Sequence, residues 1–210
     1  MDESASAAVG RPAPGLTHWY AFSFIGLGGT GQGRSDGKMR IAILGNSGSG
    51  KSTLARWLAE QSGAALLDLD TVAWAPEQIA VPRLAEDASA DVHYFCSAQG
   101  SWVIEGCYAN LVRAALRFEP LLVFLNPGKE QCIANCRSRP WEPHKYSSKT
   151  QQDERLSFLL SWVDHYYTRN GEMSLSAHVE CFHAYTGQKE ELLQLPELAP
   201  PSSRVLAWLD

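Results

Sequence analysis

The stretch Arg40–Thr53, RIAILGNSGSGKST, consists of a short apolar run, a glycine-rich turn and the start of a helix-like pattern. The turn has the spacing Gly45-x-x-x-x-Gly50-Lys51-Ser52, which is typical of a phosphate-binding loop between a strand and a helix. Glycines leave backbone N–H groups open to phosphate oxygens, and the N-terminal end of the following helix adds positive potential at the same place. The stretch therefore predicts a nucleotide-binding protein.

Two polar residues of this loop have expected roles. Lys51 is placed to reach the terminal phosphates as a mobile positive charge, and the Ser52 hydroxyl is placed to bind magnesium. We therefore expect a nucleotide and Mg²⁺ at this loop. The expected phosphate-binding residues are Gly45, Asn46, Ser47, Gly48, Ser49, Gly50, Lys51, Ser52 and Thr53. A plain glycine turn is the alternative, but a strand pattern before the turn and a helix pattern after it favour the phosphate-binding loop.

The composition limits the class of protein. The chain has 210 residues, 45% of them hydrophobic and 20% charged, which indicates a globular protein with a sizeable core. The net charge of −5 gives no general attraction to nucleic acid or to an anionic membrane. Five unevenly spaced cysteines favour a reduced, cytoplasmic setting over a disulfide framework. No stretch approaches the roughly 18 apolar residues that a membrane-spanning helix needs.

Residues 1–38 are rich in glycine and small residues and lack sustained periodicity, so we predict a flexible or disordered leader. Within it, Gly26-x-Gly28-x-x-Gly31 follows an apolar run and superficially matches a dinucleotide-binding fingerprint. The following residues, 32–38, cannot open an amphipathic helix, which disfavours this Rossmann interpretation. The folded domain is therefore expected to span residues 39–210.

Strand and helix patterns alternate after the phosphate loop. Expected strands cover 64–69, 101–105 and 121–125, and expected helices cover 51–61, 84–99, 111–118 and a segment from 129. This alternation predicts an α/β fold with a mostly parallel sheet and helices on both faces, a three-layer sandwich of the P-loop NTPase type. A long helix is expected over 151–169, with a core face made of Leu156, Leu159, Leu160, Val163 and Tyr167. Beyond Gly171 we expect a helix near 175–185, a short strand before Leu195 and a terminal helix.

A polar segment at about residues 137–150 separates two of these helices. Its stretch 137–149 contains two prolines and four cations against the single acid Glu142, an excess of +3 in an acidic chain. A basic, proline-containing insert beside a phosphate loop favours a small lid, in which Arg137 and Arg139 close over the transferring group. A solvated surface loop is the alternative.

The carboxyl ends of parallel strands meet at one edge of a sheet, and two acids are expected there. Asp68 and Asp70 are two apart on one predicted strand, and we favour Asp70, at its very end, to bind the phosphoryl acceptor, act as a base or hold magnesium through water. Its alternative role is to cap the following turn. Glu105, at the end of the next strand, is expected to bind magnesium. The expected catalytic residues are Lys51, Asp70, Glu105, Arg137 and Arg139.

The order of these features resembles the adenylate-kinase-related P-loop kinases. The resemblance rests on the phosphate loop, on Leu69-Asp70 with Trp74 and Pro76 after it, on Trp102-Val-Ile-Glu-Gly-Cys-Tyr108, on Leu125 and on the arginine-bearing lid. Within these kinases the chain is most similar to the bacterial branch labelled DNA topology modulation proteins. The similarity covers about residues 39–169, and the phosphate loop is its most specific part.

The resemblance implies a five-stranded parallel sheet, ATP with magnesium, and transfer of a phosphoryl group to a small molecule, nucleoside or nucleotide. It places Asp70 and Glu105 at the acceptor and the magnesium ion, and Arg113 near a position where relatives have an acceptor-binding arginine. Glu105 stands where aspartate is expected, and Cys107 stands where asparagine is common. The identity of the acceptor therefore does not transfer.

Two functions follow from the sequence. The first is an ATP-dependent phosphotransferase whose partners are ATP and a small acceptor, with no membrane or nucleic acid. The second is an ATP-binding regulatory or DNA-topology-associated module without kinase activity, which only the branch label suggests, since the sequence shows no basic face or reading helix. A GTPase would need an Asn-Lys-x-Asp motif, which Asn126-Pro-Gly-Lys129 does not provide. Aromatic residues near the expected site stack a base or simply pack; these are Trp74, Tyr108, Trp141 and Tyr146.

Overall fold

The computed structural model describes residues 38–75, 81–141, 147–199 and 203–209. The predicted leader, apart from Lys38, lies outside the described residues, and so do residues 142–146 of the predicted lid, including Tyr146. These residues belong to the unit that contains the phosphate loop.

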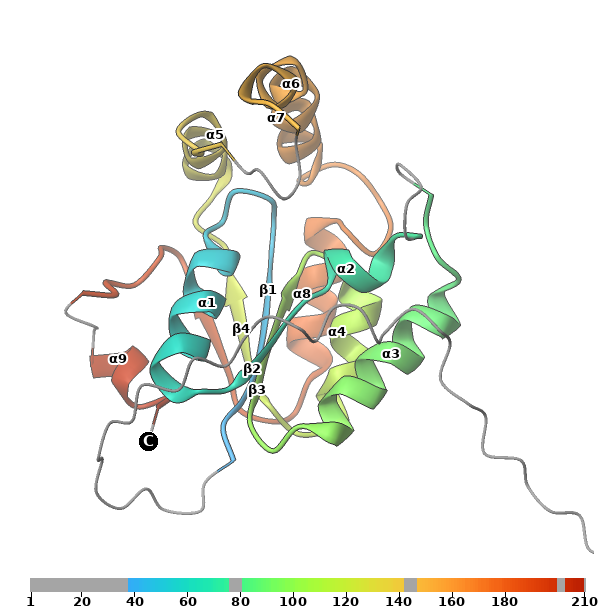
Figure 1. Cartoon of the computed structure of the whole chain (residues 1–210), viewed down its shortest axis with the longest axis vertical. Coiled ribbons are helices and arrows are strands. Elements are labelled where there is room, and N and C mark those ends of the chain that lie inside the picture. The colour runs from blue at the N-terminus through green and yellow to red at the C-terminus, as the bar shows by residue number, and fades with distance from the viewer. Residues whose placement is uncertain (1–37, 76–80, 142–146, 200–202, 210) are drawn as a thin grey trace, which may run out of the picture. The chain divides into compact units, whose positions relative to one another are not determined.

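A five-stranded, all-parallel sheet forms the centre of this unit (Figure 1). The strands are β1 (Arg40–Gly45), β2 (Ala65–Asp68), β3 (Trp102–Gly106), β4 (Leu121–Leu125) and β5 (Lys189–Leu192). Their order across the sheet is β2-β3-β1-β4-β5, so β1 lies in the middle. Its register places Ile43 beside Glu105 of β3 and Gly45 beside Leu125 of β4. The strand that carries the phosphate loop is therefore held on both sides.

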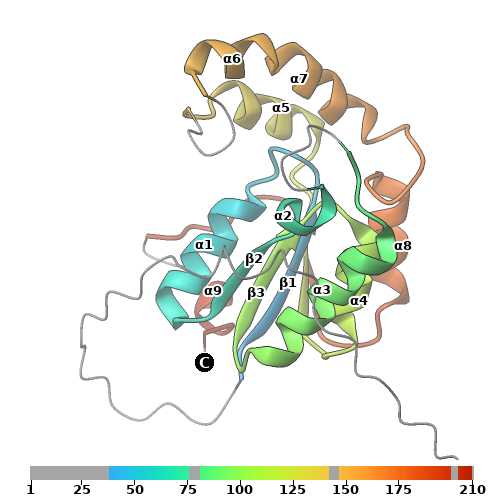
Figure 2. The same ribbon diagram turned by 45° about the vertical axis from the view of Figure 1, so that its right-hand side comes forward.

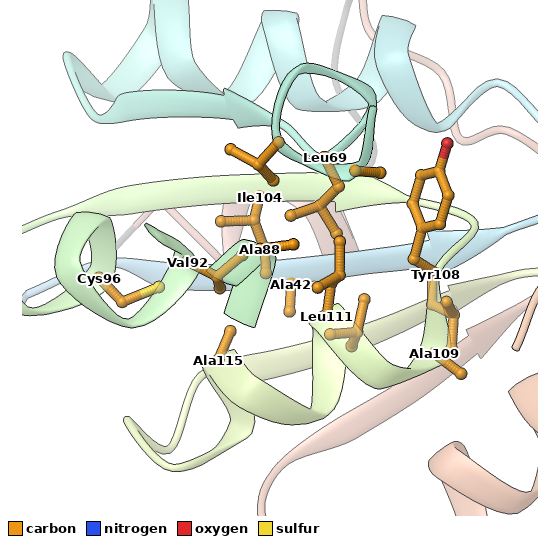
Figure 3. Packing of buried hydrophobic residues seen from close by; sticks show 14 of the residues in the cluster. Ala42, Leu69, Ala88, Val92, Cys96, Ile104, Tyr108, Ala109, Leu111 and Ala115 are labelled. Carbon is orange, nitrogen blue, oxygen red and sulfur yellow. The ribbon is translucent and has the colours of Figure 1, made fainter. Parts of the chain in front are cut away.

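Helices cover both faces of the sheet, because successive side chains of a strand point to opposite faces. In β1, Ala42 and Leu44 belong to the core beneath α3 (Ala85–Ala98), α4 (Ala109–Leu116) and α8 (Leu175–Ala184). Ile41 and Ile43 belong to the core beneath α1 (Lys51–Ser62) and α9 (Ser203–Leu206). Figure 3 shows part of the first core, with Tyr108 at one end and its hydroxyl oxygen pointing out of the cluster. The predicted fold class, a three-layer α/β sandwich, is confirmed.

The helices match most of the sequence-based predictions to within a few residues. Their bounds are α1 (Lys51–Ser62), α2 (Asp70–Ala73), α3 (Ala85–Ala98), α4 (Ala109–Leu116), α5 (Lys129–Arg137), α6 (Lys149–Glu154), α7 (Leu156–His165), α8 (Leu175–Ala184) and α9 (Ser203–Leu206). α5, α6 and α7 lie together beyond the edge at which β1 leads into α1 (Figures 1 and 2). None of the helices in the described ranges has the length and apolarity needed to cross a bilayer.

The single helix predicted over 151–169 is wrong. The segment forms α6 and α7, which meet at Arg155, and the backbone beyond His165 leaves the helix. Of the five residues expected on its core face, only Val163 is buried, while Leu159 and Leu160 are half-buried against Cys132 and Cys136 of α5. Fewer of the five residues are buried than expected because α7 packs against the helix α5 and not against the sheet. One helix covers a narrower stripe of side chains than a sheet does.

The placement of Asp68 and Asp70 on one strand is also wrong. β2 ends at Asp68, and Asp70 is the first residue of α2. The backbone N–H of Asp70 donates a hydrogen bond of 2.9 Å to Asp68 Oδ1, and the Thr71 hydroxyl donates one of 2.7 Å to the Asp68 carbonyl oxygen. An aspartate that satisfies backbone groups in this way ends a strand and starts a turn. Asp68, rather than Asp70, therefore fixes the turn.

Candidate functional site

The phosphate loop, residues 45–53, joins β1 to α1 through two glycines with left-handed backbone. Gly48 has φ 78° and Gly50 has φ 98°, values that L-residues rarely adopt. Space also requires glycine at position 48, because a Cβ there would lie 2.3 Å from the Cys132 carbonyl oxygen of α5. The loop is thus pressed against α5, and Gly50 leads directly into the first turn of α1. The first N–H groups of a helix have no partner inside that helix, so this turn offers donors to an anion.

Hydrogen bonds to α5 and α7 hold the loop in place. Asn46 is buried, and its Nδ2 donates to the Val163 carbonyl oxygen at 3.1 Å, while its Oδ1 accepts from the backbone N–H of Ser47 at 2.8 Å. Asn135 Nδ2 donates to the Gly48 carbonyl oxygen at 2.8 Å. These bonds fix the loop before any ligand binds, which lowers the cost of ordering it around phosphates.

Lys51 and Glu105 form a partly buried ion pair beside the loop. Lys51 Nζ lies 3.9 Å from Glu105 Oε2 and 3.3 Å from the Asn46 carbonyl oxygen, to which it donates a hydrogen bond. Burial by itself lowers the pKa of Lys51, but Glu105 and further anionic neighbours outweigh that effect and raise the pKa above its ordinary value. Lys51 therefore keeps its positive charge at this site.

Asp70 is oriented by two aromatic side chains. Tyr108 donates a hydrogen bond of 2.7 Å to Asp70 Oδ1, and Trp74 Nε1 donates one of 2.7 Å to the Tyr108 hydroxyl oxygen. Burial, and after it the nearby Cys107 and Asp70, raise the pKa of Tyr108 well above its ordinary value, so the phenol keeps its proton. Among the aromatic residues considered for base stacking, Trp74 and Tyr108 thus form a hydrogen-bonded relay that ends on a carboxylate.

These elements surround one cleft of about 530 Å³, a size typical of small-molecule sites. Its walls come from the phosphate loop and α1, from Asp70, from Glu105 and Gly106, and from residues 138–141 at the start of the predicted lid. Leu195, which follows β5, completes the wall beside Gly50. The cleft brings Lys51, Ser52, Asp70, Glu105 and Arg139 together.

The other predicted site residues lie elsewhere. Arg137 is exposed on the last turn of α5 and does not line the cleft. Arg113 Nη1 pairs with Glu172 Oε2 at 2.8 Å and is also not part of the cleft wall. Within the phosphate loop, Gly45, Asn46 and Ser49 are buried and do not line the cleft. The roles of all these residues in catalysis or substrate binding stay predictions.

Sequence reasoning missed several residues of the cleft wall. Of these residues, Arg56 is the one that its spacing could have revealed, because it follows the phosphate loop by one helical turn. Asn135 precedes the predicted lid and Ser138 lies within it, and Leu195 reaches the cleft only because β5 pairs with β4. Nothing in the sequence around Leu195 points to the phosphate loop.

The residues present fit a nucleotide with magnesium. The Gly48 and Gly50 conformations open the loop, and Lys51 supplies a cation at the cleft. For magnesium the cleft offers the Ser52 hydroxyl and the carboxylate of Glu105. The described ranges contain no group of three or more His, Cys, Asp or Glu side chains that would hold a metal by themselves. Magnesium with one or two carboxylates and substrate phosphates needs no such group.

The comparisons with known proteins concern the arrangement of sheet and helices. No family model and no curated protein matches the chain. Similar solved structures include a sugar kinase from Janibacter sp. HTCC2649, at 18% identity and TM-score 0.48 over 82% of this chain and 95% of that one. They also include a gluconokinase from Sinorhizobium meliloti 1021, at 19% identity and TM-score 0.47 over 82% and 93%.

A third similar structure is a shikimate kinase from Acinetobacter baumannii, at 17% identity and TM-score 0.45 over 78% of this chain and 88% of that one. The sheet order and the residues of the cleft are those of this chain itself and do not depend on these similarities. The resemblance to the branch labelled DNA topology modulation proteins stays a prediction.

Proposed function

We propose that this chain is an ATP-dependent phosphotransferase that moves the γ-phosphoryl group of ATP to a hydroxyl group of a small molecule, nucleoside or nucleotide. The observation that carries the proposal is the position of Lys51. It is the first residue of α1, directly after the left-handed Gly50, and it shares one cleft with Asp70 and Glu105. Phosphoryl transfer needs charge compensation and alignment more than covalent catalysis, and the cleft supplies both.

Each residue of the cleft has a part in this reaction. The amides at the start of α1 and Lys51 hold the donor phosphates, and Arg139 approaches them from the lid segment. Asp70, held by Tyr108, accepts the proton of the acceptor hydroxyl. ATP supplies the phosphoryl group: the acceptor oxygen bonds to Pγ, the bond from Pγ to the bridging oxygen breaks, and its electron pair leaves with ADP.

Glu105 and Ser52 are the residues that would hold magnesium. Bound there, the ion neutralises charge on the phosphate oxygens. Glu105 also pairs with Lys51, so the same carboxylate orients the cation that meets the terminal phosphates.

The test is ADP release by the purified chain with ATP, magnesium and a panel of nucleosides, nucleotides and hydroxylated metabolites. We expect turnover with at least one acceptor, and we expect Lys51→Ala to lower it by about a thousandfold. Lys129→Ala is the matched control, because Lys129 pairs with Asp164 away from the cleft. Its turnover should equal that of the wild type. ADP release that is equal in the wild type and in Lys51→Ala, for every acceptor, would refute the proposal.

A further inference from the structure

His178 is a buried polar side chain of α8 that has no part in the proposed reaction so far. None of its surface is exposed, and the ring centres of Phe124 and Tyr166 lie 6.1 Å and 5.1 Å from its own. Burial lowers its pKa to about 4, so the imidazole is neutral at pH 7. A buried polar ring costs free energy unless its nitrogens find hydrogen-bond partners. The partners of the two nitrogens therefore indicate what a histidine does at this position.

The two ring nitrogens of His178 have different partners. Nε2 lies 2.9 Å from the Cys107 carbonyl oxygen, and Nδ1 lies 2.8 Å from the Tyr166 hydroxyl oxygen. A carbonyl oxygen only accepts, so Nε2 carries the proton and donates it, and Nδ1 of the neutral ring accepts from Tyr166. A hydroxyl group can donate or accept, whereas a carbonyl oxygen cannot adapt. The Cys107 carbonyl oxygen therefore selects the tautomer of His178.

That carbonyl oxygen belongs to the turn between β3 and α4, and this turn carries two residues of the candidate site. Glu105, two residues before Cys107, lines the cleft and pairs with Lys51. Tyr108, the next residue, donates its hydroxyl proton to Asp70 Oδ1. A hydrogen bond to the backbone between Glu105 and Tyr108 restrains both side chains at once, in the way that supporting residues restrain the groups of an active site.

Backbone hydrogen bonds hold the two ends of the same turn. The Glu105 carbonyl oxygen accepts from the Leu69 N–H at 2.9 Å, and the Ala109 N–H donates to the Glu172 carbonyl oxygen at 3.0 Å. His178 adds the bond in the middle, from a position 71 residues further along the chain than Cys107. Of these bonds, the one from His178 is the one that comes from a side chain. It can therefore be removed by substitution while the two ends stay paired.

Loss of the Nε2–H group would leave a buried carbonyl oxygen without this donor. Cys107 is 8% exposed, so its carbonyl oxygen cannot simply turn to bulk water. An unpaired buried acceptor is costly, and the turn relieves that cost by moving or by admitting water. Movement of the turn displaces the side chains of Glu105 and Tyr108. Small displacements of this kind lower the rate of a reaction that depends on alignment.

We propose that His178 is a positioning residue for phosphoryl transfer, which fixes Glu105 and Tyr108 in place through its hydrogen bond to the Cys107 carbonyl oxygen. His178 does not line the cleft, so its effect on the reaction is indirect. It acts on the carboxylate that would hold magnesium and, through Tyr108, on the proposed base Asp70. This inference rests on the proposed phosphotransferase function and adds a residue outside the cleft to it.

Two amide substitutions of His178 separate the roles of its two nitrogens. Glutamine is long enough to place its amide N–H near the position of Nε2, whereas asparagine reaches only about as far as Nδ1, and both amides can donate. ADP release by the full chain is measured with ATP, magnesium and the acceptor that supports the highest turnover. We expect His178→Gln to keep kcat within about twofold of the wild type and His178→Asn to lower it by about tenfold.

The magnesium dependence gives a readout that a loss of stability alone would not change. Because Glu105 is the carboxylate that would hold the ion, His178→Asn should raise the Mg²⁺ concentration for half-maximal turnover severalfold. The dissociation constant of ATP measured without magnesium should stay that of the wild type, since the phosphate loop keeps its contacts.

Tyr166→Phe is the matched control, because it removes a hydrogen bond to the same imidazole. It takes away the partner of Nδ1 and leaves the bond from Nε2 to the Cys107 carbonyl oxygen. We expect a lower melting temperature, with the kcat and the magnesium requirement of the wild type. A fall in kcat as large as that of His178→Asn would overturn the inference, because it would show that buried packing, and not the bond to Cys107, sets the rate.

The tautomer of His178 can be measured without turnover. In the ¹⁵N-labelled full chain at pH 7, the ring nitrogen shifts of His178 should be those of a neutral imidazole protonated at Nε2. The backbone amide shifts of Cys107, Tyr108 and Ala109 should change more in His178→Asn than in Tyr166→Phe. A ring protonated at Nδ1 alone would overturn the inference, because Nε2 could not then donate to the carbonyl oxygen.

The outcomes separate the inference from the function on which it rests. Turnover that depends on Lys51 and that His178→Asn leaves at the wild-type level would overturn the inference and keep the function. No Lys51-dependent turnover with any acceptor would refute the function, and with it the role of His178 in the reaction, whichever tautomer is measured.

Discussion

Lys51 Nζ lies 3.9 Å from Glu105 Oε2, and this ion pair connects the first residue of α1 to the end of β3. Both side chains are largely buried, with 12% of Lys51 and 5% of Glu105 exposed. A pair in this position serves two purposes. It satisfies a carboxylate that would otherwise be buried alone, and it keeps a charged amine beside the phosphate loop.

The first prediction is that the ion pair between Lys51 and Glu105 stabilises the folded chain. Lys51→Ala leaves Glu105 without its cation, so we expect the free energy of unfolding at neutral pH to fall by about 1–3 kcal/mol. Glu105→Gln added to Lys51→Ala should restore most of this loss without restoring turnover. Chemical denaturation of the two single variants and the double variant gives the coupling energy. Strictly additive effects would show that the two side chains do not interact.

Gly48 provides a second prediction. Gly48→Ala should lower the free energy of unfolding by about 2–5 kcal/mol and weaken ATP binding, because a left-handed backbone is strained and the Cβ meets the Cys132 carbonyl oxygen and Cys136 Sγ. Gly63→Ala is the matched control: its φ is 71°, but a Cβ there meets nothing within 4 Å. That variant should lose only about 1–2 kcal/mol and bind ATP normally. Equal losses in thermal unfolding would argue against close packing of the loop on α5.

Tyr108 provides a third prediction. Tyr108→Phe removes the donor to Asp70 and leaves Trp74 Nε1 without its acceptor, at a cost of about 1–2 kcal/mol in stability. Because Asp70 loses its fixed orientation, kcat should fall by about tenfold while KM for ATP stays the same. Trp74→Phe keeps the bond from Tyr108 to Asp70 and should have a smaller effect on kcat. If Tyr108→Phe changes only stability, Tyr108 does not position Asp70 for the reaction.

The buried side chain of His178 should make the free energy of unfolding depend on pH. Burial lowers its pKa to about 4, and the hydrogen bond to the Cys107 carbonyl oxygen offsets this effect only in part. An unfolded histidine titrates near pH 6.5, so as the pH falls below that value the unfolded state binds a proton that the folded state does not. Stability is therefore fully present above about pH 6.5 and decreases by about 3 kcal/mol as the pH approaches 4.

The measurement is the free energy of unfolding from pH 7 to 4 for the wild type and for His178→Gln. The variant should lack this part of the pH dependence. His183→Gln, at an exposed position of the same helix, should keep it. A wild-type profile parallel to that of His178→Gln would contradict the assignment of His178 as a buried neutral group.

The fold class could be predicted because it depends on short-range patterns. The apolar run before Gly45 and the alternation of strands and helices determine a parallel sheet, and hydrophobic periodicity reports them directly. The predicted helix over 151–169 failed because the same periodicity does not tell what an apolar face packs against. In α7 that face packs against α5, so Val163 is buried whereas Leu159 and Leu160 stay half-buried.

Less of the candidate site could be predicted, since it depends on contacts between distant segments. The phosphate loop is contiguous and carries its own signature, and its expected residues Lys51 and Ser52 lie in the cleft. The bond from Tyr108 to Asp70 joins residues 38 apart, and neither residue type specifies it. The position of Arg113 beside Glu172, 59 residues later, depends on the same kind of long-range contact.

The central claim is that the backbone at the start of α1 binds the polyphosphate of ATP. Amide nitrogen and proton chemical shifts, recorded while Mg²⁺ and ATP are added to the full chain, test it most directly. The largest shifts should occur at Gly48, Gly50, Lys51 and Ser52, and Lys51→Ala should weaken the binding that they report. Saturating ATP that leaves these four amides unshifted, or shifts only amides outside the cleft, would contradict the claim.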